Sequence, residues 1–280
     1  MSGKVVVVTG STKGIGRGLA REFIKRGHSV VVSGRTQAAV DEAVADVSKD
    51  AVNGAKALGV PCDVIDYAAV QKLWDKAVAA FGRVDIWINN AGMSNSRFPI
   101  GHLLQDEVEA VPRTNLVGTL NGSHVALKGM KAQSQINGIS GDLYNFEGFG
   151  SNGSKQRGMS LYGCTKFAIT YFTKCLIAET KGGAVRVGYL SPGIVITDLS
   201  VRDKTKVPPK QWAFTIMIYN ILADRVETVT PWLVENVLAN TKHGARIAWL
   251  TRGKSLWRFL KSRFVKPGDR FPELHLPKAA

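Results

Sequence analysis

The chain has 280 residues, 45% of them hydrophobic and 21% charged, which are ordinary proportions for a folded protein and exclude an intrinsically disordered one. Its three cysteines form no Cys-x-x-Cys pair, so we expect neither a disulfide framework nor a metal site. The formal net charge of +15 favours contact with a polyanion, whether nucleic acid, an anionic membrane or a phosphorylated ligand.

Short apolar runs alternate with helix-length amphipathic segments along most of the chain. Strands are predicted at Val5–Thr9, Ser29–Ser33, Gly59–Asp63, Val84–Ile88, Asp142–Phe146, Arg186–Leu190 and Arg246–Leu250. Helices are predicted at Ile15–Arg26, Ala38–Lys49, Tyr67–Phe81, Pro112–Ala132, Leu161–Thr180 and Thr230–Asn240. This alternation predicts a single-domain α/β fold over residues 1–253, a doubly wound sheet of about seven parallel strands with helices on both faces.

Two segments depart from this alternation. Residues 197–224 contain Pro208 and Pro209 ahead of the apolar run Trp212–Ala223, which predicts an inserted loop with its own helix. Residues 254–280 form a basic amphipathic tail in which large apolar residues stand among lysines and arginines. This composition suits a tail folded over the subunit, which we favour, or a segment lying on an anionic membrane.

A glycine-rich turn follows the first predicted strand in the segment VVVVTGSTKGIG. Glycines leave room for backbone to approach a pyrophosphate, and the N-terminus of the next helix offers free N–H groups and a positive dipole end. The alternative is a tight turn without a ligand. The candidate cofactor-binding residues here are Gly10, Ser11, Thr12, Lys13, Gly14, Ile15 and Gly16.

The end of the second strand lacks the acid that binds the ribose 2′-hydroxyl of NAD. No Asp or Glu occurs between Glu22 and Asp41, and Arg35 stands where that acid is expected. Arg35 and Lys13 together suit a phosphate, which predicts NADP(H) as the cofactor. The alternative is two solvated surface cations.

Tyr162 and Lys166 are four residues apart on a predicted helix, so they lie on one face of it. The ammonium of Lys166 is expected to lower the pKa of Tyr162, and Tyr162 is then the proton donor and acceptor of a catalytic reaction. The alternative is an ordinary surface pair.

Six motifs stand in the order found in the short-chain dehydrogenase/reductase family, and the chain resembles that family from Val5 to about Leu250. They are TGSTKGIG, CDV, NNAG, TN, YGCTK and SPGIVIT. The resemblance implies a Rossmann-type fold, a substrate lid at residues 197–224 and a homodimer or homotetramer. It also implies catalytic roles for Tyr162, Lys166 and Asn115, the last in a proton path or, alternatively, as a structural residue. Further cofactor contacts implied are Asp63, Val64, Asn89, Ala91, Gly92, Pro192, Gly193, Val195 and Thr197.

The family's catalytic serine is absent. Aligning Asn145 with the Asn of the family motif places Gly148 at the serine position. Ser151, 11 residues before Tyr162, is the nearest hydroxyl, and we predict that it reaches the site; the alternative is an ordinary loop serine. The chlorophyll b reductase branch of the family has a similar glycine, which makes this branch a second, weaker resemblance.

These features predict an NADPH-dependent reductase of a ketone or aldehyde. The apolar segment in the lid favours a bulky, water-poor substrate. The alternative is a nucleotide-sensing or nucleic-acid-binding protein on a reductase scaffold, although no specific nucleic-acid motif is present.

Because no signal peptide is recognisable, we expect a cytoplasmic protein, peripheral to a membrane if the tail binds lipid. The helix Leu161–Thr180, apolar on more than one face, predicts a homo-oligomer.

Overall fold

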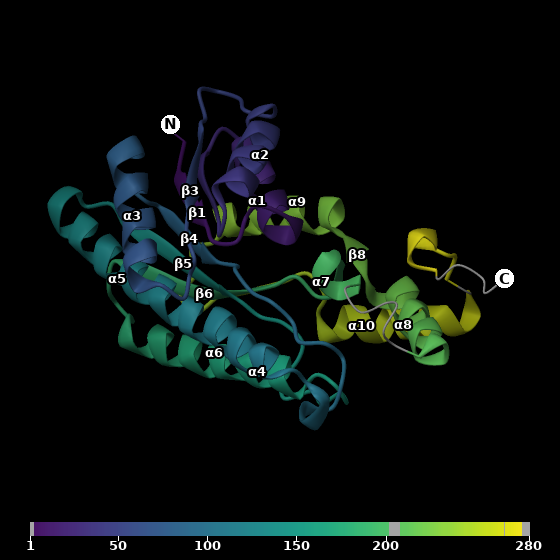
Figure 1. Cartoon of the computed structure of the whole chain (residues 1–280). Helices are drawn as coiled ribbons and strands as arrows, with labels where there is room; N and C mark the ends of the chain where they lie inside the picture. Colours follow the sequence, from purple (N-terminus) through teal and green to yellow (C-terminus); the bar gives the residue numbers. More distant parts are fainter. Residues whose placement is uncertain (1–2, 202–207, 266, 276–280) are drawn as a thin grey trace.

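Seven parallel strands form one sheet in the order β3-β2-β1-β4-β5-β6-β9 in the structure, a computed structural model that describes residues 3–201, 208–265 and 267–275 (Figure 1). The strands are β1 Val5–Val8, β2 Ser29–Gly34, β3 Ala57–Pro61, β4 Ile86–Asn89, β5 Gly141–Phe146, β6 Val185–Ser191 and β9 Arg246–Ala248. The predicted doubly wound fold is confirmed. The strand order reverses between β1 and β4, and in such sheets ligands bind outside the carboxyl ends of the strands at this point.

The four valines of β1 show how the sheet is buried on both faces. Val6 and Val8 pack into one apolar core and Val7 into the other, because successive strand residues point to opposite faces. Helices α1 Gly14–Ile24, α2 Gln37–Ser48 and α9 Val226–Ala239 cover the first face, and α3 Tyr67–Phe81, α5 Gly118–Asn137 and α6 Ser160–Glu179 cover the second. A run of β-branched residues is what a strand buried on both faces requires.

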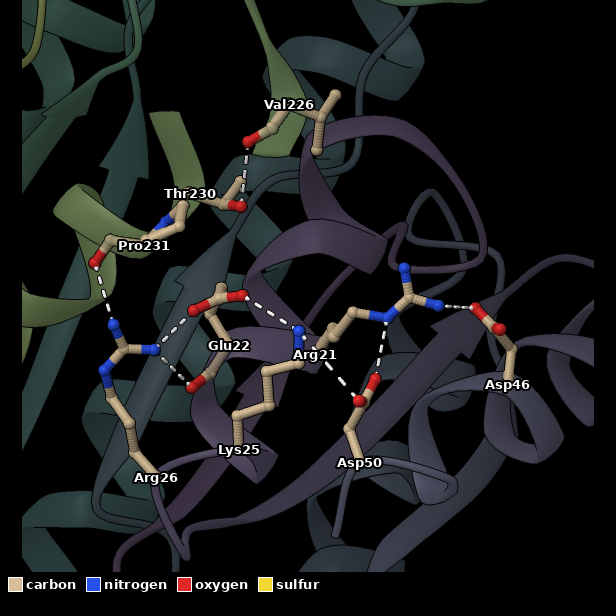
Figure 2. A network of polar contacts seen from close by, with 9 residues as sticks. All are labelled: Arg21, Glu22, Lys25, Arg26, Asp46, Asp50, Val226, Thr230 and Pro231. Atoms are coloured by element: carbon tan, nitrogen blue, oxygen red, sulfur yellow. Dashed lines mark hydrogen bonds and ion pairs between the residues drawn. The ribbon is translucent and has the colours of Figure 1, made fainter. Parts of the chain in front are cut away.

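Ion pairs join the helices of the first face (Figure 2). Arg21 of α1 pairs with Asp46 of α2 and, at 3.1 Å, with Asp50 just beyond that helix. Arg26 donates to the main-chain oxygen of Pro231 in α9 at 3.4 Å. Because such partly exposed pairs contribute little free energy, they fix the orientation of α1, and hence of the glycine-rich turn before it, more than they stabilise the fold.

The helix predicted at Pro112–Ala132 begins earlier than expected. Helix α4, Gln105–Pro112, continues through a π-helical turn, Arg113–Val117, into α5. Proline is tolerated at the start of a helix, which is where the prediction placed Pro112. Here it instead lies inside a longer helix, and the wider π-helical turn follows it directly.

The predicted inserted loop contains two helices, α7 Asp198–Val201 and α8 Pro209–Leu222, between the short strands β7 Val195–Ile196 and β8 Asp224–Arg225. The predicted tail contains helix α10, Arg252–Phe264, and a 3₁₀ turn, Pro272–Leu274. Residues 202–207 of the loop, and Lys266 and 276–280 of the tail, lie outside the described residues.

The described part of the tail folds back onto α8, away from the sheet (Figure 1). Phe271 and Leu274 form a small third core with Trp212, Ile216 and Tyr219 of α8. The indole Nε1 of Trp212 donates to the main-chain oxygen of Leu274 at 2.9 Å. The tail therefore supports the helix that borders the carboxyl ends of the sheet.

Candidate active site

A cavity of about 670 Å³ lies at the carboxyl ends of the central strands. Its wall combines the glycine-rich turn, the ends of β4, β5 and β6, helix α6 and helix α8. The predicted site residues in this wall are Ile15, Gly92, Ser151, Tyr162, Lys166, Pro192, Gly193, Val195 and Thr197. Residues distant in the sequence therefore meet in one cavity.

Tyr162 and Lys166 lie one turn apart on α6 and both face the cavity. The Lys166 Nζ is 5.8 Å from the centre of the Tyr162 ring and donates to the main-chain oxygen of Phe146, at the end of β5, at 3.2 Å. The Tyr162 N–H donates to Asn95 Oδ1 at 3.0 Å. These bonds fix the pair against the end of the sheet.

Burial, more than charge, sets the pKa values of this pair. Burial lowers the pKa of Lys166 to about 8, although the nearby Glu147 carboxylate opposes the shift. Burial raises the pKa of Tyr162 to about 12, so the protein's own groups do not produce the expected lowering by Lys166. The cost of burying a phenolate exceeds the attraction of an ammonium beside the ring. Tyr162 consequently keeps its proton near neutral pH.

Gly148 stands directly against the Tyr162 hydroxyl. A Cβ atom at position 148 would lie 2.5 Å from Tyr162 Oη and 3.2 Å from Lys166 Cε. Any larger residue here, including the serine of the family motif, would have to displace the tyrosine hydroxyl. Glycine at position 148, in place of the family's serine, therefore leaves room for the hydroxyl of Tyr162.

Ser151 does line the cavity, but its hydroxyl is used by the loop. The Oγ accepts from the Gly148 N–H at 3.0 Å and donates to the main-chain oxygen of Lys166 at 3.3 Å. Because a hydroxyl has one proton, this geometry does not provide a donor toward Tyr162. It fixes the loop that carries Gly148 against α6.

Glu147, the other residue at the family's serine pair, is buried and paired. Its Oε2 lies 2.7 Å from Arg246 Nε of β9, and both residues line the cavity. Sequence analysis missed Arg246. Glu147 could have indicated such a partner, because an acid next to a buried strand end needs a cation nearby.

Asn115 is fully buried in the π-helical turn and lies outside the cavity wall. Its Oδ1 accepts from the Met93 N–H at 2.8 Å, and its Nδ2 donates to the Met93 oxygen at 2.9 Å and to Thr165 Oγ1 at 3.0 Å. The side chain therefore joins the segment after β4 to α6. Its role in proton transfer stays a prediction.

The glycine-rich turn fits a dinucleotide pyrophosphate. Gly10 and Gly14 have φ angles of +62° and +55°, which favour glycine. A Cβ at Gly16 would lie 2.5 Å from the Asn90 side chain and from the Gly10 oxygen. Helix α1 begins here without a side-chain cap, so its first N–H groups remain for an anion.

Two predicted cofactor residues, Ser11 and Thr12, connect this turn to β2. Ser11 Oγ donates to the Val8 oxygen at 2.7 Å and accepts from the Ser33 N–H at 2.9 Å, joining β1 to β2. Thr12 lies against Gly34 at the end of β2. The side chain of Asn89 is buried in a network with Ser123 and Asn145 and does not face the cavity.

Asn90 and Gly92 of the NNAG motif line the cavity. The Asn90 Nδ2 donates to the oxygens of Thr9 and Gly10 at 2.9 and 3.0 Å, which fixes the glycine-rich turn. The N–H of Ala91 donates to Thr9 Oγ1 at 3.0 Å.

The two cations predicted to bind a phosphate differ in their partners. Arg35 is exposed directly after β2 and forms no ion pair with any described residue, whereas Lys13 pairs with Asp198 at 3.2 Å. Asp63 Oδ1 accepts from the Ile65 N–H at 3.2 Å, and Val64 packs against Gly118. Among the described residues, no cluster of His, Cys, Asp or Glu suits a metal ion.

A doubly wound parallel sheet with a dinucleotide cradle, beside a buried lysine and a half-buried tyrosine, defines an oxidoreductase fold and site of the nicotinamide-dependent class. Residues 4–207 match the family model described as short chain dehydrogenase, and the chain belongs to this family. It is accordingly a member of an oxidoreductase family that uses NAD(P)(H).

The curated relatives include reductases from plants and fungi. The chain is 31% identical over 287 residues to the "Probable chlorophyll(ide) b reductase NYC1, chloroplastic" of Oryza sativa subsp. japonica, covering 96% of this chain and 54% of that protein. It is 35% identical over 244 residues to the Chlorophyll(ide) b reductase NOL of Arabidopsis thaliana, covering 86% and 67%. It is 29% identical to Versicolorin reductase 1 of Dothistroma septosporum, covering 92% of each. The chain thus spans about half the length of the NYC1 relative.

Solved structures share the fold. A short-chain type dehydrogenase/reductase from Mycobacterium marinum matches with a TM-score of 0.77 and 24% identity, over 90% of this chain and 96% of that chain. Levodione reductase matches with a TM-score of 0.77 and 22% identity, over 90% and 98%.

Proposed function

We propose that this protein reduces the carbonyl group of a ketone or aldehyde with NADPH, using Tyr162 as the proton donor. The observation that carries the proposal is the position of Tyr162 in the cavity wall, one helical turn from Lys166, whose Nζ lies 5.8 Å from the centre of the Tyr162 ring. The adjacent ammonium favours release of the phenol proton to a substrate oxygen, because it stabilises the phenolate that forms.

The chain's own residues account for the proton transfer in this reaction. When bound, the reduced dinucleotide supplies the hydride to the carbonyl carbon. Tyr162 Oη gives its proton to the carbonyl oxygen as negative charge develops there, and the Lys166 ammonium stabilises the phenolate that remains. Ser151 has the role of a positioning residue, because it fixes the Gly148 loop with its hydroxyl.

The preference for NADPH rests on Arg35. Its guanidinium is exposed at the end of β2, where NAD-specific sites carry an acid, and it has no ion pair with a described residue. It is therefore available for a bidentate contact with a 2′-phosphate. Lys13 contributes less, because its ammonium is shared with Asp198.

A bulky apolar substrate is supported by large apolar side chains in the cavity wall. Phe214 and Ile218 of α8 and Leu250 after β9 line the cavity there. A small polar molecule would leave these side chains in contact with water. Relatives named as reductases of chlorophyll(ide) b and of versicolorin agree with this class of substrate.

The experiment is NADPH oxidation with a panel comprising a steroid, a quinone, a β-keto ester, a bicyclic ketone and a formyl tetrapyrrole. We expect turnover of at least one bulky member and loss of turnover in Tyr162→Phe, with NADPH affinity nearly unchanged because only a hydroxyl is removed. NADPH binding without reduction of any member would instead favour a nucleotide-sensing protein. Comparable activity in Tyr162→Phe would show that the acid is another group.

A further inference from the structure

Helix α10 presents a row of large apolar side chains to solvent. Leu256, Leu260 and Phe264 recur every four residues and so lie along one side of the helix, and Trp257 and Phe259 flank them. The five side chains are between 40% and 87% exposed. We call these five residues the α10 stripe. Isolated exposed apolar residues are ordinary, but a contiguous row marks a contact surface.

The side of α10 that packs against the protein lies opposite the stripe. Arg258 lies two residues from both Leu256 and Leu260, hence away from the stripe, and its Nη1 donates to Asp224 Oδ2 at 2.9 Å and to the Leu222 oxygen at 3.0 Å. The Lys254 Nζ lies 3.3 Å from the centre of the Trp249 ring. These contacts hold α10 against β8 and α8, so rotation to bury the stripe would break them.

The buried carboxylate that anchors α10 stays charged. Burial opposes the charge of Asp224, but hydrogen bonds from Trp249, Arg258 and Arg270 together hold the pKa of its carboxyl below the ordinary value. The anchor is therefore present throughout the neutral pH range.

No described residue covers the stripe. The chain after α10 turns back to α8, where Phe271 and Leu274 complete the third core. Within the described part of the chain, no helix is long and apolar enough to cross a membrane. A contact of the stripe with lipid would therefore have to lie in the interface of a bilayer.

The charge of α10 indicates which partner contacts the α10 stripe. Residues Arg252–Phe264 contain no Asp or Glu, and besides Lys254 and Arg258, which contact the protein, they carry three exposed cations, Arg252, Lys261 and Arg263. A second copy that met the stripe with its own α10 would set these cations against cations. An anionic bilayer accepts the apolar side chains among its acyl chains and the cations at its headgroups.

We propose that the α10 stripe docks this protein on the surface of an anionic lipid bilayer. The inference stands apart from the proposed reaction, because it concerns a surface rather than the chemistry of the cavity.

The test is cosedimentation of the full chain with vesicles of phosphatidylcholine alone or with about one third phosphatidylglycerol, at low salt and at about 0.15 M salt. We expect binding to the anionic vesicles, weaker at higher salt, and little binding to the neutral ones. Leu260→Ser/Phe264→Ser should lower the partition coefficient at least about tenfold. Lys261→Gln/Arg263→Gln should weaken binding to the anionic vesicles alone.

The matched control is Ile136→Ser, which removes a side chain that is 85% exposed on α5. It should bind as the unmodified protein does, and the melting temperatures of all variants should agree because the altered side chains are exposed. Equal binding by the stripe variant and the unmodified protein would overturn the proposal. So would loss of self-association in the stripe variant without any vesicle binding, which would make a second copy the occupant.

Discussion

At the nucleotide end of the site the glycine-rich turn consists of one short segment, whereas at the substrate end the cavity wall consists of side chains from distant segments. The glycine-rich turn follows β1 directly, and Asn90 fixes it with two hydrogen bonds to main-chain oxygens. The substrate end joins the Gly148 loop to β9 through Glu147 and Arg246, and to α8, which the tail supports. The first end follows a pattern that many dinucleotide-binding proteins share, whereas the second depends on contacts between residues far apart in the sequence.

The largest expected effect lies where the two ends meet. Lys166→Met removes the ammonium that donates to the Phe146 oxygen and stabilises the phenolate, and we expect kcat/KM for carbonyl reduction to fall by about 100-fold or more. Steady-state kinetics with NADPH measures it. A rise in the KM for NADPH without a fall in kcat would show that Lys166 acts only in binding the nucleotide.

The pH dependence of the unmodified enzyme sharpens the role of Lys166. Its pKa is lowered to about 8, so the ammonium is present below that pH and is lost as the pH rises through it. Tyr162, with a pKa of about 12, stays protonated over the same range. We therefore expect kcat/KM for reduction to decline above about pH 8, and Lys166→Arg to move the decline to higher pH. A flat profile from about pH 6 to about pH 10 would contradict this.

An intermediate effect is expected at the nucleotide end alone. Arg35→Ala should raise the KM for NADPH about tenfold or more, because a charged hydrogen bond contributes about 1.5–3 kcal/mol, and leave the KM for NADH nearly unchanged. Lys13→Ala is the matched control and should have the smaller effect, since Lys13 pairs with Asp198. Equal turnover of NADPH and NADH by the unmodified protein would remove the preference.

The smallest effect on activity is expected from the outer face of α6. Phe167 and Tyr171 lie one turn apart and are 56% and 69% exposed, whereas Ile169 and Leu176 are buried. We expect a homodimer or homotetramer that buries this pair, and a shift toward monomer in Phe167→Ser/Tyr171→Ser with kcat little changed. Light scattering at micromolar concentration measures it, and Leu104→Ser, also exposed, serves as control. A strictly monomeric unmodified protein would contradict the prediction.

The nucleotide end was predictable because its causes are local. Apolar runs such as Val5–Val8 specify strands, and glycines mark the turns where a side chain would collide. The helix boundary at Pro112 was missed because proline suits both a helix start and a π-helical turn within a longer helix.

The substrate end was predictable only in part, because its causes are contacts between distant residues. Sequence spacing placed Ser151 near Tyr162, but the direction of its hydroxyl is set by the Gly148 N–H and the Lys166 oxygen. The pairing of Glu147 with Arg246 spans 99 residues, and the burial of Trp212 depends on Leu274. No local pattern identifies such partners.

The most direct measurement of the central claim, that Tyr162 donates the proton from a position that leaves no room for the family's serine, is kcat for Gly148→Ala and Gly148→Ser. A Cβ at this position would lie 2.5 Å from Tyr162 Oη and force the hydroxyl aside. Because a displacement of about 1 Å costs about 100-fold in rate, we predict a comparable fall in kcat for both variants, with NADPH affinity unchanged. A Gly148→Ser enzyme as active as the unmodified one, or more active, would contradict the account.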